Sequence, residues 1–589
     1  MQQCGRQKQK ESFSRFADIS IGKKLYNINI IDMIDRNFIK LYEESFKENW
    51  ELPALTDYNT AETLTYGEMA AKIARLHILF RLCQLRRGDK ISVVGRNNSN
   101  WVISYMAVVT YGAIIVPILQ DFNSNDISHI IRHSESSMLF VSDHIWENLD
   151  IDALPGLRAV VSLNDFSCYY QRGGESVVAY LNGMDDLFTK NYPTGFTRDD
   201  IKYAELSNDK IIEINYTSGT TGYSKGVMLT GNNLAGNVLF GMKTNLHYKG
   251  SKALSFLPLA HAYGCAFDML TTLAVGAHIT LLGKLPSPKV LLKAFAEVKP
   301  NLIVCVPLIF EKIYRKQVLP QLSETPLRWA VTLPVLNTRI YEKIKKKLID
   351  ALGGRFEQVI IGGAPLNPEV ENFFRKIKFP FTVGYGMTEC APLISYSPWK
   401  EFIPRSSGQI LKGIMDVKIE SEDPYLIPGE ICVKGENVMR GYYKNDKATA
   451  EVIDSEGWLH TGDMGIIDKD KNIFIKGRYK NMILGPSGQN IYPEEIESKL
   501  NNMPFVNESI VVEKDGKLVA LVYPDLEAAD KCGISSCELE EAMEEIRVNL
   551  NKEVAPYENI AKIYIYPTEF EKTPKRSIKR YLYANFSPI

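Results

Sequence analysis

The hydrophobic pattern in the first part of the chain alternates between two kinds of segment. Residues 91–95, 113–119 and 138–142 are short apolar runs, which are typical of buried strands. Residues 125–133, between two of these runs, carry apolar side chains at helical spacing. Strands that alternate with helices in this way predict parallel sheets whose faces are covered by helices.

The same alternation continues beyond the middle of the chain. Ser287 and Pro288 form a favourable helix start, because serine caps the first turn and proline fits the first helical position. The apolar run at 302–306 predicts a further buried strand. In residues 337–352 apolar side chains recur at every fourth position, and Gly353 follows as a cap. This part of the sequence therefore also favours an α/β architecture.

The pattern changes after about residue 405. Short, turn-bounded segments at 429–434, 466–468 and 472–476 predict a β-barrel-like region. Beyond residue 480 we predict helices at 493–500 and 537–550 and strands at 508–513 and 518–523. The expected fold is therefore α/β. A large domain (1–479) holds the helix-covered parallel sheets and the barrel-like region, and a small mobile α+β domain (480–589) follows.

Charge and cysteine usage narrow the classes of partner. The 589 residues include 69 basic and 70 acidic side chains, which gives a net charge of −1. A nearly neutral chain has no long-range electrostatic field that would attract a polyanion, and we predict no nucleic-acid partner. Nine cysteines are scattered along the chain, and the one close pair, Cys532 and Cys537, has no histidine nearby. We therefore expect reduced thiols and no zinc site.

Two features of the sequence bear on its location. The first residues are basic, but no apolar stretch follows them, so an ordinary secretory signal is not expected. The longest uncharged apolar run, residues 105–120, is short for a membrane span and contains Tyr111, Gly112 and Pro117. It predicts a helix, a turn and a buried strand. These features predict a cytoplasmic protein; a peripheral membrane contact and the oligomeric state stay open.

The strongest chemical signal is a segment rich in glycine and hydroxyl side chains that ends with a lysine. It extends from Tyr216 to Gly226, and the extended segments on either side predict a loop between two strands. Backbone N–H groups of such a loop can converge on phosphate oxygens, and lysine adds a positive charge. The spacing differs from a Walker A loop, since Lys225 is followed by glycine. The candidate phosphate-binding residues are Thr217, Ser218, Gly219, Thr220, Thr221, Gly222 and Lys225.

This segment resembles the phosphate loop of the adenylate-forming (AMP-binding) superfamily, which includes acyl-CoA synthetases, luciferases and peptide-synthetase adenylation domains. The resemblance continues in order from Thr63 to Leu582 and so covers nearly the whole chain. It implies ATP and Mg²⁺ as cofactors and coenzyme A as a substrate. The phrases at 569–574 and 578–582 look most like bacterial long-chain fatty-acid–CoA ligases.

Two glycine-containing turns match the family's adenine site. The first, residues 362–366, implies that Gly363, Ala364 and Pro365 pack on adenine. The second extends from Gly384 through Tyr385 and Gly386 to Thr388 and Glu389. In the resembled family its tyrosine stacks on adenine, its threonine binds phosphate and its glutamate holds Mg²⁺.

Further site residues follow from the same resemblance. Asp463 matches the carboxylate that accepts both ribose hydroxyls, and Arg478 matches the arginine that joins it. His261 corresponds to a residue at the carboxylate end of the acid pocket. Asp268 matches the residue that holds the amino group in amino-acid adenylation domains, but we expect it to cap a helix or to face solvent.

The C-terminal part carries the resemblance further and also departs from it. Lys480 falls at the family's hinge between two half-reactions, and Gly488 falls in the segment that lines the pantetheine channel. The family's catalytic lysine, however, corresponds to Ser577 here. A serine hydroxyl supplies neither the charge nor the reach of lysine. We expect Lys579 or Lys575 to substitute, and we favour Lys579.

The resemblance implies an ATP-dependent acid–CoA ligase that proceeds through an acyl-adenylate. A fatty acid, with a long chain favoured, is the expected substrate, because small or apolar residues at 390–393 replace the tryptophan that closes the pocket of acetate-specific relatives. Two alternatives stay open. One is a fatty acyl-AMP ligase that loads a carrier protein, and the other is a nucleotide-binding relative without turnover.

Overall fold

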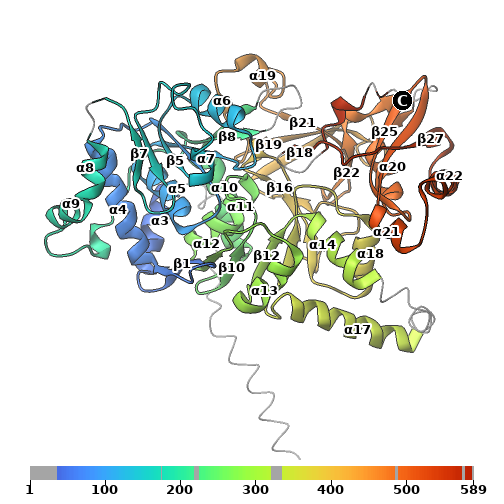
Figure 1. Cartoon of the computed structure of the whole chain (residues 1–589), viewed down its shortest axis with the longest axis horizontal. Helices are drawn as coiled ribbons and strands as arrows, with labels where there is room; N and C mark the ends of the chain where they lie inside the picture. Colours follow the sequence, from blue (N-terminus) through green and yellow to red (C-terminus); the bar gives the residue numbers. More distant parts are fainter. Residues whose placement is uncertain are drawn as a thin grey trace, which may run out of the picture.

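The computed structural model describes residues 36–173, 176–217, 224–319, 334–484, 489–573, 578–584 and 586. Within these ranges two large sheets lie next to each other and are covered by helices, a smaller β-rich region follows, and a helix-covered sheet ends the chain (Figure 1). This arrangement confirms the expected α/β fold with a barrel-like region and a small α+β part.

The first large sheet contains the three strands expected at the start of the chain. β3, β4 and β5 pair in parallel, with β3 in the middle. Gly112 ends the helix before β4 in a left-handed conformation with φ 88°, which suits a residue without a Cβ. The apolar run at 105–120 is therefore a helix end, a turn and a buried strand, as predicted. In order across the sheet, the strands are β20 (Gly441–Tyr442), β9 (Lys225–Thr230), β8 (Ile211–Thr217), β4 (Ile114–Ile118), β3 (Lys90–Val94), β5 (Ser136–Val141), β6 (Ala159–Ser162) and β7 (Cys168–Gln171).

The second large sheet is also mainly parallel. Its neighbours β14–β13–β12–β10–β11–β1 all run in one direction, and only the edge strand β2 is antiparallel. The carboxyl ends of these parallel strands therefore meet at one edge. The strands are β14 (Phe381–Val383), β13 (Gln358–Ile361), β12 (Leu302–Cys305), β10 (Lys252–Ser255), β11 (His278–Leu281), β1 (Pro53–Asp57) and β2 (Thr63–Thr65).

Several predicted helices form where the sequence placed them. The serine start gives Ser287 as the N-cap of its helix, and its hydroxyl accepts a hydrogen bond from the N–H of Val290. Gly353, which follows the helix predicted at 337–352, has φ 94°, as expected for a cap. The helices are α3 (Phe38–Glu48), α4 (Tyr66–Leu82), α5 (Ser99–Tyr111), α6 (Ser124–Ser134), α10 (Gly231–Lys243), α13 (Pro288–Val298), α14 (Pro307–Ile313), α17 (Pro334–Ala351) and α18 (Pro368–Lys376).

The β-rich region after residue 405 is built on an antiparallel four-stranded sheet. Its order is β18–β19–β21–β22, so strands that are distant in sequence become direct neighbours. This pairing places Glu420 opposite Glu430 and Cys432 opposite His460. The strands are β18 (Met415–Glu420), β19 (Gly429–Gly435), β21 (Leu459–Ile467) and β22 (Ile473–Arg478).

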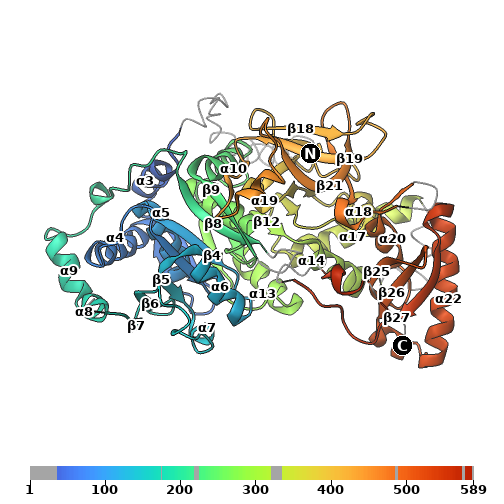
Figure 2. The same ribbon diagram turned by 90° about the horizontal axis from the view of Figure 1, so that it is seen from above.

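The C-terminal part has a hydrophobic core of its own. Buried residues from Ile491 to Ile563 pack together, while the main core extends from Phe38 to Ile473. In both views this part lies at the opposite end of the long axis from α8 (Val177–Asn182) and α9 (Met184–Asn191) (Figure 2). The exact boundary at residue 480 stays a prediction. The elements are α20 (Pro493–Leu500), β25 (Val506–Lys514), β26 (Lys517–Pro524), α22 (Ser536–Glu553) and β27 (Ile560–Ile565).

Candidate functional site

The candidate site is a large cleft that begins at the carboxyl edge of the second sheet. Loops that follow β10, β12, β13 and β14 leave this edge together, and ligands of open α/β sheets bind where such loops converge. Residues of the first large sheet, strands β21 and β22 and the C-terminal part supply the remaining walls. The candidate residues in the described ranges that line the cleft are Thr217, Lys225, His261, Gly363, Ala364, Pro365, Gly384, Tyr385, Gly386, Thr388, Glu389, Asp463, Arg478 and Lys579.

Three of these residues form a hydrogen-bonded chain. The hydroxyl of Tyr385 donates to Oδ2 of Asp463 at 2.6 Å, and Nε of Arg478 donates to Oδ1 of the same carboxylate at 2.8 Å. Asp463 and Arg478 face each other across β21 and β22. Burial raises the pKa of Asp463, whereas the Arg478 charge and the Tyr385 hydroxyl oppose that rise. The arrangement holds an acceptor-only carboxylate in place, which suits a diol.

The phosphate-loop residues flank a strand hairpin. β8 ends at Thr217, β9 begins at Lys225, and these two residues are paired. The prediction that the loop joins two strands is therefore confirmed. Five candidates of the loop and one of the pantetheine channel lie outside the described residues: Ser218, Gly219, Thr220, Thr221, Gly222 and Gly488.

One residue that sequence reasoning missed connects Lys225 with Glu389. Nζ of Lys225 lies 4.8 Å from the ring centre of Tyr442, and the Tyr442 hydroxyl donates to Oε1 of Glu389 at 2.9 Å. Tyr442 lies on β20, which pairs with β9. Burial and the nearby Glu389 charge raise the pKa of the phenol well above its usual value, so the hydroxyl keeps its proton and stays a donor.

The glycines of the two turns are needed for different reasons. A Cβ on Gly386 would lie 2.3 Å from the carbonyl oxygen of Pro392, so a larger residue would displace the backbone beside Glu389. Gly363 has φ 87°, a conformation that residues with a side chain rarely adopt. Sequence reasoning gave the first turn little weight by itself and the second turn more, and the close approach at Gly386 shows a structural need for glycine in the second turn.

The comparisons with known proteins agree with this geometry. Residues 42–443 match the family described as "AMP-binding enzyme". The chain belongs to this family. Two relatives are similar to it: long-chain-fatty-acid–CoA ligase FadD15 of Mycobacterium bovis, 27% identical over 88% of this chain and 90% of its own length, and 4-coumarate–CoA ligase 1 of Oryza sativa subsp. japonica, 27% identical over 94% of both.

Solved structures share the fold of this AMP-binding enzyme. The ATP-bound RpMatB-BxBclM chimera B1 has a TM-score of 0.74 at 22% identity, covering 93% of this chain and 99% of that one. The anthranilate CoA ligase AuaEII in complex with anthranoyl-AMP also has a TM-score of 0.74, at 18% identity, covering 93% of this chain and 96% of that one. The expected family is confirmed, and adenylate-forming CoA ligases of this family use ATP, Mg²⁺ and coenzyme A.

The donors around Glu389 fit the magnesium ion that this AMP-binding family uses. The Glu389 carboxylate and the Thr388 hydroxyl are adjacent oxygen donors on the cleft wall, and Mg²⁺ prefers oxygen ligands. The hydrogen bond from Tyr442 fixes the direction of the carboxylate. Among the described residues, no ion pair from Lys or Arg occupies Glu389.

The acid-pocket candidates behave differently from each other. His261 lines the cleft, and its Nδ1 accepts a hydrogen bond from the N–H of Tyr263 at 3.3 Å, so the ring is oriented by its own turn. Asp268 does not face solvent, and that expectation was wrong. Its side chain is only 2% exposed within the π-helix Cys265–Leu270, because this stretch is packed on all sides.

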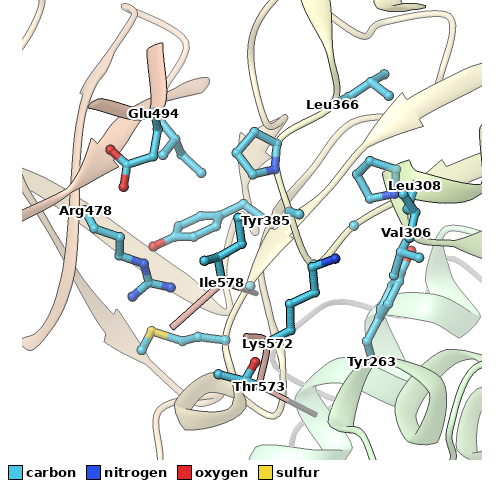
Figure 3. A pocket seen from close by; sticks show the side chains of 18 of the residues that line it. Tyr263, Val306, Leu308, Leu366, Tyr385, Arg478, Glu494, Lys572, Thr573 and Ile578 are labelled. Atoms are coloured by element: carbon cyan, nitrogen blue, oxygen red, sulfur yellow. The ribbon is translucent and has the colours of Figure 1, made fainter. Parts of the chain in front are cut away.

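The C-terminal segment reaches into the cleft. Figure 3 shows Lys572, Thr573 and Ile578 in the pocket, with Arg478 on one side of the view and Tyr263 and Val306 on the other. Lys572 pairs with Ile578 as an antiparallel neighbour. Its Nζ contacts Oε1 of Glu508 at 2.6 Å and also the Glu569 carboxylate. Sequence reasoning did not single out Lys572.

Of the two lysines proposed to replace the missing one, Lys579 lies within the described residues. Nζ of Lys579 lies 3.4 Å from Oε2 of Glu571, and the side chain is about one-third exposed at 33%. Lys575 and Ser577 lie outside the described residues.

No helix within the described ranges is both long and apolar enough to cross a membrane.

Proposed function

We propose that this AMP-binding enzyme converts a long-chain fatty acid to its coenzyme A thioester. The carboxylate of the acid attacks the α-phosphorus of ATP, and pyrophosphate leaves. The thiol sulfur of coenzyme A then attacks the acyl carbon, AMP leaves, and the thiol proton is released. The protein mainly positions the reactants and balances charge, as in other transfers at phosphorus.

The residues divide this work. Asp463, held by Tyr385 and Arg478, binds the ribose hydroxyls of the nucleotide. Lys225 places a positive charge beside the phosphates at the start of β9. A Mg²⁺ ion held at Glu389 would neutralise the phosphate charge. His261 lines the cleft, and its proposed role is to orient the substrate at the carboxylate end of the acid pocket.

The observation that carries the choice of a fatty acid is an apolar wall of the cleft. It is built by loops and helices that follow the neighbouring strands β11, β10 and β12. An alkyl chain gains about 0.8 kcal/mol per buried methylene on such a surface. The residues of this wall are Phe256, Leu257, Phe267, Leu282, Leu291, Phe295, Val306 and Leu308.

The test is ATP–pyrophosphate exchange across a series of acids. We expect exchange to rise with fatty-acid chain length and to be weaker with 4-coumarate, since an aryl acid buries less apolar surface. Phe267→Asp should abolish the length dependence, and Lys225→Ala is the control that lowers exchange with every acid. A preference for 4-coumarate over all fatty acids would contradict the proposed substrate.

The final acceptor needs a separate assay. Pre-made fatty acyl-adenylate is supplied together with free coenzyme A or with a phosphopantetheinylated carrier protein. We expect the thioester of free coenzyme A to form faster. Faster loading of the carrier protein would instead favour the fatty acyl-AMP ligase alternative. If none of the acids supported pyrophosphate exchange, the alternative of a nucleotide-binding relative without turnover would be favoured.

A further inference from the structure

Four potential metal ligands converge on the β-rich region, outside the residues assigned to ATP and acid. Glu420 lies on β18, Glu430 and Cys432 on β19, and His460 on β21. Strand pairing places Glu420 opposite Glu430 and Cys432 opposite His460. One ligand atom from each residue lies within 4.8 Å of all the others. The cluster therefore depends on sheet register and not on closeness in sequence.

Two of the distances within the cluster are close to those of a compact tetrahedral site. Sγ of Cys432 lies 3.4 Å from Nδ1 of His460, and Nδ1 lies 2.9 Å from Oε2 of Glu430. Zinc binds sulfur at about 2.3 Å and nitrogen at about 2.0–2.1 Å, so neighbouring ligand atoms in a tetrahedral site lie roughly 3.5 Å apart. Small side-chain shifts would be enough to admit the ion.

Groups behind the cluster orient two of the ligands. Nε2 of His460 faces Oδ2 of Asp454 at 3.8 Å, the position of the carboxylate that usually supports a metal-bound histidine. The N–H of Gly462 donates to Oε1 of Glu430 at 2.9 Å, which leaves Oε2 directed at the histidine. Glu430 is therefore held by a partner other than His460, and Asp454 lies near the free side of the His460 ring.

The charge around the cluster favours a dication. Glu420, Glu430 and Asp454 are three carboxylates, and Lys418 is the cation beside them, 3.2 Å from Glu420 and 4.0 Å from Asp454. The three carboxylates and the one ammonium together carry a formal charge of −2. Burial and the Glu420 and Glu430 charges raise the pKa of the Cys432 thiol to about 12, so a metal ion would have to displace its proton.

We propose that Cys432, His460, Glu430 and Glu420 bind Zn²⁺ or a similar borderline divalent cation. A sulfur, a nitrogen and two oxygen ligands suit zinc better than magnesium or calcium, which prefer oxygen alone. Because His460 and Asp463 share β21, and Glu430 holds the N–H of Gly462 beside Asp463, the ion would stiffen the strand that presents the ribose-binding carboxylate. This site is independent of which acid the enzyme activates.

The test is titration of the purified full-length protein with Co²⁺, followed by competition with Zn²⁺. A thiolate–cobalt absorption band with about one ion per chain is expected, and Zn²⁺ should remove it. Cys432→Ser should lose the band, and Cys168→Ser, which changes a half-buried thiol on β7, should keep it. A band that survives in Cys432→Ser, or no band in the wild type, would overturn the proposal.

A second variant keeps the proposal testable if Cys432→Ser does not fold. Glu420 is exposed, so Glu420→Gln should fold normally while its affinity for Zn²⁺ falls about tenfold or more. The matched control is Glu422→Gln, which changes an accessible carboxylate near the same strand but outside the cluster. Equal Zn²⁺ affinities of the two variants would also overturn the proposal.

Discussion

The hydroxyl of Tyr442 donates a 2.9 Å hydrogen bond to Oε1 of Glu389, while the ring of the same tyrosine lies under the ammonium group of Lys225. One side chain therefore positions both the carboxylate proposed to hold Mg²⁺ and the lysine proposed to face the phosphates. Neither contact could be anticipated from the Gly-Tyr-Tyr sequence, which carries no chemical signal by itself.

Tyr442→Phe tests this double role. Removing the hydroxyl leaves the ring under Lys225 but frees the Glu389 carboxylate. A hydrogen bond to a charged group is worth about 1.5–3 kcal/mol, so adenylate formation should fall about tenfold to a hundredfold. The Mg²⁺ concentration needed for half-maximal pyrophosphate exchange should rise as well.

Tyr443→Phe is the matched control for Tyr442→Phe. The Tyr443 hydroxyl also donates to a carboxylate at 2.9 Å, but that carboxylate is Glu135, away from the cleft. Its exchange rate and Mg²⁺ requirement should stay close to those of the wild type. Equal effects of the two substitutions would show that Tyr442 does not act through Glu389.

Asp463→Asn tests the proposed ribose site. The variant keeps the shape of the side chain but loses the charge that binds Arg478 and accepts the Tyr385 hydroxyl. We expect the KM for ATP to rise about tenfold or more, because two charge-assisted hydrogen bonds weaken. The KM for the acid should change little. Kinetics with ATP and acid varied separately would check this, and an unchanged KM for ATP would remove Asp463 from the site.

The sequence predicted the fold well in segments with one clear hydrophobic pattern. Strands such as β3, β4 and β5 are buried on both faces, so they appear as continuous apolar runs. The turn at Gly112 and the cap at Ser287 follow from backbone geometry that few residues satisfy. Strand order could not be predicted in the same way, because β10 lies between β11 and β12 only after long crossovers.

The site was predictable only as far as its residues lie in contiguous motifs. Tyr385, Asp463 and Arg478 each stood out within a motif, but their mutual hydrogen bonds require the pairing of β21 with β22. The sequence predicted no zinc site, because the cysteines are scattered and the one close pair, Cys532 and Cys537, has no histidine nearby. The register of β19 and β21 places His460 beside Cys432, across 28 positions of sequence.

Lys579→Ala tests which lysine takes the place of the one missing at Ser577. Within the part of the chain that the structure describes, Lys579 pairs with Glu571 at 3.4 Å and keeps about a third of its side chain exposed, so it can turn toward the substrate carboxylate. Pyrophosphate exchange should fall strongly in Lys579→Ala, while thioester formation from pre-made acyl-adenylate survives. Ser577→Lys should preserve or raise exchange.

Lys572→Ala separates the loss of exchange caused by removing Lys579 from the effect of a general structural change in the C-terminal segment. Lys572 is held by Glu508 and Glu569 and is only 16% exposed, so its main role is to neutralise those carboxylates. We expect lower thermal stability and a smaller loss of exchange than in Lys579→Ala. Normal exchange in Lys579→Ala would show that another group, or no lysine of this segment, assists adenylation.

The buried Asp268 makes stability depend on pH in a definite direction. Its Oδ2 has no hydrogen-bond partner within the described part of the chain, and burial raises the pKa of the carboxyl well above 3.8. The folded protein therefore keeps a proton that the unfolded chain releases above about pH 4. Its contribution to stability is fully present below that pH and is lost as pH rises toward the folded-state pKa, by about 1.4 kcal/mol per pH unit.

Asp268→Asn removes this titration while keeping the size of the side chain. Relative to the wild type, the variant should therefore gain thermal stability as pH rises from about 4 toward the folded-state pKa of Asp268, and the difference should be smallest at the acid end. Asp186→Asn, at an exposed position on α9, is the control and should show no such trend. Thermal unfolding midpoints at matched pH values provide the measurement. A constant difference between Asp268→Asn and the wild type would mean that Asp268 is ionised in the folded protein, and that a partner compensates its burial.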